Sequence, residues 1–282
     1  MKYTVEVTIS CGVDQAGILP ALLLDVGFEA FEEIEGGIKA YLAEEDWSQT
    51  TAAELEALLR TLGVNAKAVV QKIEERDWNE IWESSLEPIA VGRFCIIPVH
   101  AMSGSHDGGE RIPLYIQPQM SFGTGYHATT RLMLQLMQEK IGEGDRVLDA
   151  GTGTGVLAIA AIKLGAGSAF GFDIDHWAGD NAPENVRRNA VEDRVQIAVG
   201  GIEMAPEEPY DVILANINLN VLIALMPDFE ARLSEGGSLI LSGVLSKDTD
   251  ILVQAMEACG LGPSTTRTEG EWMAGICNRR AN

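Results

Sequence analysis

The first quarter of the chain alternates between strand-like and helix-like patterns. Residues 3–10 place apolar and polar side chains in turn, which is the period of a strand with one buried face. Further along, the glycines of Glu35-Gly36-Gly37 separate two strand-like runs, as in a hairpin turn. The predicted elements are strands at 3–10, 28–34, 38–43 and 67–73 and helices at 17–27 and, capped by Thr50 or Thr51, at about 50–62. Their order, βαββαβ, predicts a small ferredoxin-like α+β domain over residues 1–75.

Beyond a linker at 76–95, longer apolar runs alternate with helical patterns. Strands are predicted at 93–97, 112–116, 147–148, 168–172, 195–199, 210–216, 237–243, 264–268 and 272–277, with helices near 132–137, 156–164, 181–189 and 248–259. Alternating β and α units followed by a terminal hairpin predict a doubly wound α/β fold. We expect a Rossmann-like methyltransferase sheet with an antiparallel edge strand over residues 96–282.

The linker carries a pair of tryptophans. Trp78 and Trp82 are four residues apart, so they would share one face of a helix. We interpret the pair as a packing surface against a neighbouring domain rather than as part of a binding site.

The middle of the chain holds a glycine-rich turn between a strand and a helix. A buried strand ends at Asp149, and Gly151, Gly153 and Gly155 then alternate ahead of an apolar helix. Glycines at alternate positions let the backbone turn sharply and leave no side chain over the turn. A ligand there can meet the N–H groups that open the helix. An ordinary strand-to-helix turn is the alternative, but the acid Asp173 at the end of the next strand favours a ligand site.

The turn lacks the features of phosphate-binding loops. A dinucleotide fingerprint would place its third glycine at Val156, and a P-loop would end in Gly-Lys-Ser/Thr, which Val156-Leu157 excludes. The pattern D-x-G-x-G-x-G resembles motif I of the class I S-adenosylmethionine-dependent methyltransferases, whose ligand carries no phosphate. Asp173 lies 22 residues past Gly151, where nucleotide-binding sheets place an acid for ribose hydroxyls.

Two further segments carry candidate chemistry. Residues 117–130 form an apolar, glycine-rich loop ahead of an amphipathic helix, and its notable side chains are Phe122, Thr124, His127 and Thr130. A plain loop with a threonine N-cap is the alternative, but it leaves the glycines unexplained. Hydroxyls and backbone N–H groups in such a loop suit closure over a ligand. Asn216 ends a strand at the carboxyl edge of the predicted sheet, where open α/β folds bind ligands.

Composition narrows the functional classes. An apolar content of 46% over 282 residues is enough for a sizeable core. A net charge of −22 makes nucleic acid a poor partner, because phosphate contacts supply most of that affinity, and it suits either a basic protein partner or solubility alone. The four cysteines lack metal or disulfide spacing, which predicts buried thiols in a reducing cytoplasm and no metal. No secretory signal or membrane span is expected.

The assembled residues resemble the family of ribosomal protein L11 methyltransferases. The resemblance spans nearly the whole chain and rests on Phe122-Gly123-Thr124-Gly125 with His127 and Thr129-Thr130, on the turn from Asp149 to Gly155, on Asp173 and on Ala215-Asn216-Ile217. It implies transfer of methyl groups from S-adenosylmethionine to amino groups (the α-amine and lysine ε-amines) of ribosomal protein L11. It also implies that the N-terminal domain binds that protein. We expect a cytoplasmic monomer without a direct nucleic-acid or membrane partner.

The resemblance also implies roles for individual residues. The family's cofactor positions fall on Thr130, Gly151, Asp173 and Asn216, and the loop and turn add Phe122, Asp149, Gly153 and Gly155. Asn216, Thr124 and His127 are the expected catalytic residues. Asn216 would hold the cofactor or the amine through its side-chain oxygen. His127 is either a general base or, as we prefer, a residue that orders the loop. Ala128 and Gln119 depart from residues common in the family, which leaves the detail of the loop open.

Two other functions stay open. The first is methylation of RNA, DNA or a small molecule, although Asn216-Ile217-Asn218-Leu219 lacks the Asn/Asp-Pro-Pro-aromatic run common in base-amine enzymes. The second is a non-catalytic adenosylmethionine-binding or ribosome-assembly module. The intact glycines argue against this second function only weakly, because binding and catalysis use the same groups.

Overall fold

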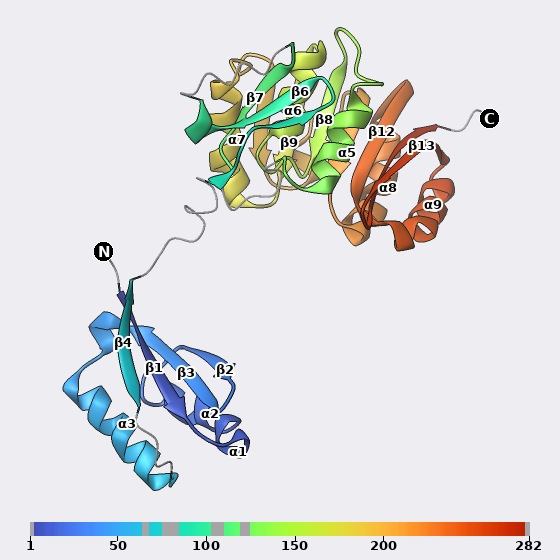
Figure 1. The fold of residues 1–282 in the computed structure, drawn as a ribbon. Helices are drawn as coiled ribbons and strands as arrows, with labels where there is room; N and C mark the ends of the chain where they lie inside the picture. The colour runs from blue at the N-terminus through green and yellow to red at the C-terminus, as the bar shows by residue number, and fades with distance from the viewer. Residues whose placement is uncertain (1–2, 64–67, 75–84, 103–109, 119–124, 280–282) are drawn as a thin grey trace. The chain divides into compact units, whose positions relative to one another are not determined.

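The chain folds into two compact units, Met1–Trp78 and Asn79–Asn282. A computed structural model describes residues 3–63, 68–74, 85–102, 110–118 and 125–279 (Figure 1). Trp78 and Trp82, the expected tryptophan pair, lie outside the described residues. None of the described helices is both long and apolar enough to cross a membrane.

The first unit is a four-stranded antiparallel sheet with helices on one face. Its elements are β1 (Tyr3–Ser10), α1 (Val13–Ala16), α2 (Leu19–Leu24), β2 (Ala30–Ile34), β3 (Gly37–Ala43), a 3₁₀ turn (Glu44–Asp46), α3 (Gln49–Thr61) and β4 (Val69–Glu74). The strand order β2-β3-β1-β4 is that of the expected ferredoxin-like domain. Alternate residues of β1, namely Val5, Val7 and Ile9, are fully buried in its core.

Two local details of this unit differ from the sequence pattern. The helix expected at 17–27 is the shorter α2, and a separate short helix, α1, precedes it at Val13–Ala16. Pro20 lies in the first turn of α2, where its missing N–H costs no hydrogen bond. Helix α3 is capped by Ser48 rather than by Thr50 or Thr51. The hydroxyl of Ser48 accepts a hydrogen bond from the amide of Thr51 at 3.1 Å. An N-cap residue precedes the first helical residue, and α3 begins at Gln49, so Thr50 and Thr51 already lie inside the helix.

The second unit is built on a seven-stranded sheet. Its strands are β8 (Arg146–Ala150), β9 (Ser168–Asp173), β10 (Val195–Val199), β11 (Tyr210–Asn216), β12 (Leu233–Leu245), β13 (Leu261–Glu269) and β14 (Trp272–Arg279). Their order is β10-β9-β8-β11-β12-β14-β13. Six of these strands run in the same direction, and β14 runs in the opposite direction. The Rossmann-like fold is therefore confirmed. The antiparallel strand lies one position in from the edge, because the final hairpin inserts β14 beside β12 and leaves β13 outside.

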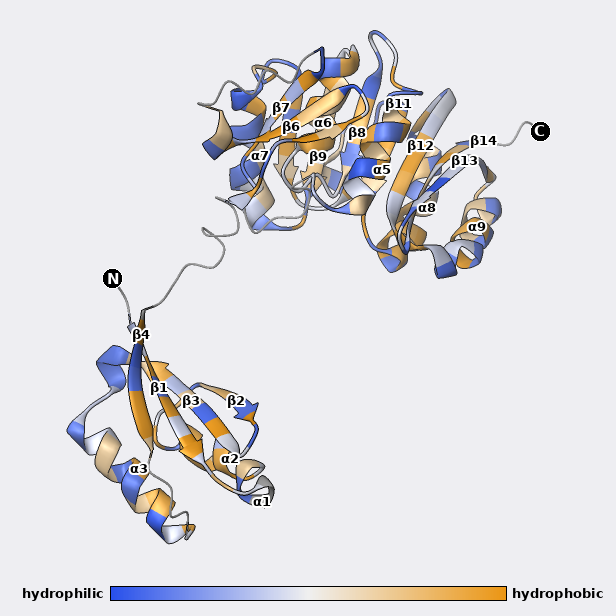
Figure 2. Cartoon of the chain, in the orientation of Figure 1, coloured by the Kyte–Doolittle hydropathy of each residue, from blue (hydrophilic) through white to orange (hydrophobic). Residues whose placement is uncertain are grey.

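Layers cover both faces of this sheet. On one face pack α5 (Ala128–Met137), α6 (Val156–Leu164), α7 (His176–Arg188) and a small sheet of β5 (Ile89–Val91), β6 (Phe94–Pro98) and β7 (Ile112–Ile116). On the other face pack α8 (Leu219–Arg232) and α9 (Thr249–Ala258). The neighbouring residues Val147 and Leu148 of β8 belong to opposite cores, as expected for a strand buried on both faces. Figure 2 shows hydrophobic segments, in orange, along the strands of this sheet.

Candidate active site

The carboxyl ends of β9, β8 and β11 lie side by side and bring the expected residues to one edge of the sheet. The strands are parallel, with Ala150 opposite Phe172 on β9 and Ala215 on β11. Asp173 and Asn216 are the last residues of β9 and β11, and the glycine turn follows β8. This is the edge at which open α/β sheets bind ligands.

The glycine turn needs its glycines for two reasons. Gly151, Gly153 and Gly155 have φ angles of +72°, +52° and +79°, in the left-handed region that side chains disfavour. In addition, a Cβ on Gly151 would lie 2.3 Å from Cγ2 of Ile217. The amide of Gly151 donates to the carbonyl of Phe172 at 2.9 Å, which ties the turn to the end of β9.

Asp149 lies near the end of β8, just before the turn, and is fully buried. Its Oδ2 accepts the hydroxyl of Thr152 at 2.7 Å and the amide of Ala158 at 3.2 Å. Its Oδ1 has no hydrogen-bond partner among the described residues. Burial, assisted by the charge of Asp173, raises the pKa of this carboxyl to about 7, although the two hydrogen bonds act in the opposite direction. The unpartnered oxygen suits a positively charged group of a ligand, which would favour the carboxylate form.

Asp173 is held in one orientation by backbone amides. Its Oδ2 accepts the amide of Gly153 at 2.9 Å, and its Oδ1 accepts the amide of Asp175 at 3.0 Å. A carboxylate has about four acceptor positions, so two remain for hydroxyl groups such as those of a ribose. The side chain is half-buried beside the glycine turn, which supports the predicted ribose contact.

Asn216 and Thr130 meet across the site, although they are 86 residues apart in sequence. The Nδ2 of Asn216 donates to the hydroxyl of Thr130 at 3.5 Å. Thr130 lies in the first turn of α5 and is 1% exposed, whereas Asn216 is only half-buried. The contact fixes which end of the amide faces α5, and Oδ1 has no partner among the described residues. An acceptor is thus available at the end of β11.

His127 orders the start of α5. It is the N-cap of the helix, and its Nδ1 accepts the amide of Thr129 at 3.4 Å and lies 2.8 Å from the hydroxyl of the same residue. Its ring packs edge-on against Trp272 of β14, with centroids 4.8 Å apart. These contacts support the ordering role that we preferred from the sequence. The remaining expected loop residues, Phe122 and Thr124, lie outside the described residues.

Three contributors to the site region were not among the expected residues. Arg131 of α5 donates to the carbonyl of Tyr126 and forms an ion pair with Glu269, and Trp272 supports His127. Both partners come from the final hairpin, more than 130 residues further along. No local sequence pattern marks such contacts, because they depend on the insertion of β14 next to β12.

A second missed feature was readable in the sequence. Helix α7 carries Asn181 and Asn185, its C-cap residue is Asn189, and all three, at intervals of four, are buried. Asparagine is a poor residue for a helix interior, so its repetition on one face was a visible sign of polar contacts.

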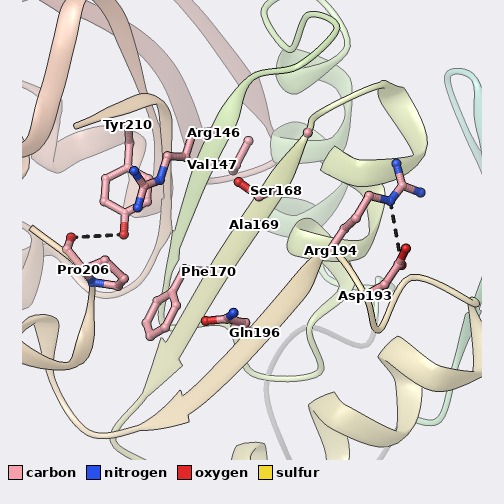
Figure 3. Close-up of a pocket in the computed structure, with 11 residues that line it drawn as sticks. Arg146, Val147, Ser168, Ala169, Phe170, Asp193, Arg194, Gln196, Pro206 and Tyr210 are labelled. Carbon is pink, nitrogen blue, oxygen red and sulfur yellow. Dashed lines mark hydrogen bonds and ion pairs between the residues drawn. The ribbon is translucent and has the colours of Figure 1, made fainter. Parts of the chain in front are cut away.

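A cavity of about 170 Å³ lies at the opposite end of the sheet (Figure 3). It is lined near the amino ends of β8 and β9 by residues that include Arg146, Ser168 and Phe170. The guanidinium of Arg146 lies over the ring of Tyr210 and also pairs with Glu208. These contacts account for the charge of Arg146, and the cavity contains none of the expected site residues. Within the described ranges, no group of three or more His, Cys, Asp or Glu residues is arranged to hold a metal ion.

Comparisons with known proteins agree on one family. The family model described as ribosomal protein L11 methyltransferase (PrmA) matches residues 24–280. A ribosomal protein L11 methyltransferase from Chlorobaculum tepidum is 39% identical over 277 residues, which cover 96% of this chain and 95% of the relative. The protein of the same name from Porphyromonas gingivalis is 37% identical over 276 residues, covering 95% and 91%.

A solved structure extends the similarity to the fold. The crystal structure of a ribosomal protein L11 methylase from Lactobacillus delbrueckii subsp. bulgaricus matches with a TM-score of 0.64 and 26% sequence identity. The match covers 70% of this chain and all of that one.

Proposed function

The chain belongs to the ribosomal protein L11 methyltransferase family, and we propose that it methylates amino groups of ribosomal protein L11 with S-adenosylmethionine as the donor. The methyl acceptors in this proposal are the α-amine and lysine ε-amines. The observation that carries it is the contact of Asn216 with Thr130, beside a glycine turn flanked by Asp173. An acceptor for an amine and a cradle for the cofactor thus lie at one edge of the sheet.

The residues of the turn fit adenosylmethionine. Its ribose diol matches the two acceptor positions left on Asp173, and its positive charges match the unpartnered, buried Oδ1 of Asp149. Gly151, Gly153 and Gly155 place no side chains on the turn, which suits the close approach of a ligand without phosphates. When bound, the cofactor supplies a methyl group on a sulfonium, a leaving group that needs no further activation.

The protein's own task is alignment and control of a proton. An amine attacks the methyl carbon in line, and holding the two reactants in that geometry removes most of the entropic barrier. A lysine amine has a reference pKa of about 10.4 and attacks only when neutral, so the site must favour loss of its proton. Exclusion of water lowers the pKa of the amine, and the Oδ1 of Asn216 accepts a hydrogen bond from one of the two N–H groups of the neutral amine. The sulfonium needs no Lewis acid, so the proposed reaction is metal-independent, and activity should survive excess chelator.

The first unit is the proposed site of substrate recognition. Residues 1–78 contain 15 acidic and 6 basic side chains, which suits attraction of a basic protein. The same charge disfavours direct binding of nucleic acid. We place the enzyme in the cytoplasm as a monomer that meets L11 there, consistent with the free thiols of Cys11, Cys95, Cys259 and Cys277.

One assay tests the proposal against its alternatives. The full chain is incubated with methyl-labelled adenosylmethionine and a mixture of large-subunit proteins and RNA, and the label is located by mass. Label on L11 amines is expected. Label confined to RNA would identify the chain as an RNA methyltransferase instead, and binding of cofactor without any label would indicate a non-catalytic module.

A further inference from the structure

Helix α7 and its C-cap residue pack three buried asparagines against the rest of the domain. Asn181, Asn185 and Asn189 are 2%, 0% and 5% exposed. Residues four apart lie on one face of a helix, so the three amides form a continuous polar strip. Buried amides are costly unless they are hydrogen-bonded, and such a strip persists only if other polar groups meet it.

The strip pairs with the backbone that continues β7. Asn189 accepts the amide of Tyr115 at 3.0 Å and donates to its carbonyl at 2.7 Å. Two residues further along, Asn185 accepts the amide of Gln117 at 2.8 Å, and Asn181 donates to its carbonyl at 3.4 Å. The side chains therefore take the place of a neighbouring strand on the side of β7 that does not face β6.

Asn185 differs from Asn189 because it also reaches the glycine turn. Its Nδ2 donates to the carbonyl of Thr154 at 3.0 Å and to Oδ1 of Asn181 at 3.0 Å. Thr154 lies between Gly153 and Gly155 and is fully buried. A single amide thus bridges the candidate cofactor turn and the segment at Gln117.

The β9–α7 unit holds three successive residues of the turn. The carboxylate of Asp173 accepts the amide of Gly153 at 2.9 Å, and Asn185 holds the carbonyl of Thr154. A Cβ on Gly155 would lie 3.2 Å from the Cβ of Ala182, so the helix packs directly against the backbone there. Contacts from α7 therefore hold the Thr154–Gly155 end of the turn, while β9 holds the amides of Gly151 and Gly153.

We propose that Asn185 is a positioning residue that sets the cofactor turn and links it to the segment at Gln117, eight residues before Gly125. The inference rests on the proposed function, because it takes the turn as the adenosylmethionine site. Loss of the Asn185 amide removes one hydrogen bond from the carbonyl of Thr154 and one from the amide of Gln117 together. Cofactor affinity should then fall by more than the loss of stability explains.

The test compares two variants of the same helix in the full chain. Asn185→Ala removes the bridge, whereas Asn189→Ala removes two part-buried hydrogen bonds to β7 and one to the carbonyl of Asn185 without touching the turn. S-adenosylhomocysteine binding is measured by calorimetry well below each variant's Tm. Asn185→Ala should bind about tenfold more weakly than Asn189→Ala, the factor that one ordinary hydrogen bond represents. KM for adenosylmethionine should rise while kcat at saturating cofactor changes less.

A second variant serves as a check on folding and separates the contact of Asn185 with Gln117 from its contact with Thr154. Asn185→Asp keeps an acceptor for the amide of Gln117, with Arg188 close enough to balance the charge, but loses the donor to Thr154. It should also weaken cofactor binding. Equal dissociation constants for Asn185→Ala, Asn185→Asp and Asn189→Ala would overturn the inference. Failure of the wild-type chain to bind S-adenosylhomocysteine would instead overturn the proposed function.

Discussion

Arg131 of α5 and Glu269 at the end of β13 form an ion pair between residues 138 positions apart in the chain. The same guanidinium donates to the carbonyl of Tyr126, immediately before the N-cap His127. The final hairpin therefore supports the start of α5, the helix that carries Thr130 of the candidate active site.

Glu269→Gln should reduce activity more than stability. The pair is about one-third exposed, so its loss should cost less than about 1 kcal/mol of unfolding free energy. The loop at Tyr126 loses its brace, and because catalysis is sensitive to small displacements, kcat/KM should fall by about 3- to 10-fold. Methyl-transfer kinetics and thermal unfolding measure the two effects. Glu56→Gln, which removes the exposed pair with Arg60, is the control and should leave both unchanged.

Asn216→Ala should lose at least about 100-fold in kcat/KM, because the acceptor at the end of β11 and its contact with Thr130 disappear together. The side chain is half-buried and contributes little to the core, so the Tm should change little. Asn220→Ala, an exposed asparagine in the adjoining helix, should behave as the wild type. Near-normal turnover of the Asn216 variant would remove this residue from the mechanism.

Gly151→Ala should destabilise the protein and abolish cofactor binding. A left-handed φ costs an alanine about 1–2 kcal/mol, and here the Cβ would also lie 2.3 Å from Ile217. Gly236→Ala isolates the first effect, because Gly236 has a φ of +79° and a Cβ there would have no other atom within 4 Å. Urea unfolding should therefore show a larger loss for Gly151→Ala than for Gly236→Ala. Similar losses in the two variants would show that the contact with Ile217 relaxes freely.

Asp149 should make the ligand-free protein less stable as the pH rises. Its pKa is about 7 in the folded chain and about 3.9 when unfolded, so between these values the folded state binds more protons. The contribution of Asp149 to stability is fully present below about pH 4, falls as the pH increases and levels off above pH 7. From pH 5 to 7.5 the contribution is about 2–3 kcal/mol. Urea unfolding at both pH values should show this decline in the wild type, and Asp149→Asn should lack it. An equal decline in the variant would assign the effect to other groups.

Much of the fold could be predicted from local patterns. The strict alternation in β1 follows from burial of one face, and the adjacent apolar residues Val147 and Leu148 of β8 follow from burial of both faces. Each pattern is visible without knowledge of the neighbouring strands. Cap positions were less predictable. Ser48, Thr50 and Thr51 are all competent caps, and the choice depends on where the preceding chain turns into α3. The position of the antiparallel strand was also open, because a hairpin can join a sheet through either of its strands.

The candidate site also contains residues that local sequence predicts and contacts that depend on tertiary packing. Gly151, Gly153, Gly155 and Asp173 were predictable because the backbone conformation and the strand end that they serve are local properties. The approach of Asn216 to Thr130 was expected only by resemblance, and the geometry that joins them comes from the order of β8, β11 and α5 in space.

The amino-acid sequence by itself determined the two-part α/β architecture, the glycine turn with its acidic partner and the family to which the chain belongs. These depend on hydrophobic periodicity, on φ angles that only glycine tolerates easily, and on short motifs. The tertiary structure alone decided that Asn185 joins the turn to Gln117 and that Glu269 braces α5 through Arg131. Such pairs are set by the packing of whole elements, because a hydrogen bond needs its partners within about 3 Å and no local pattern specifies that distance.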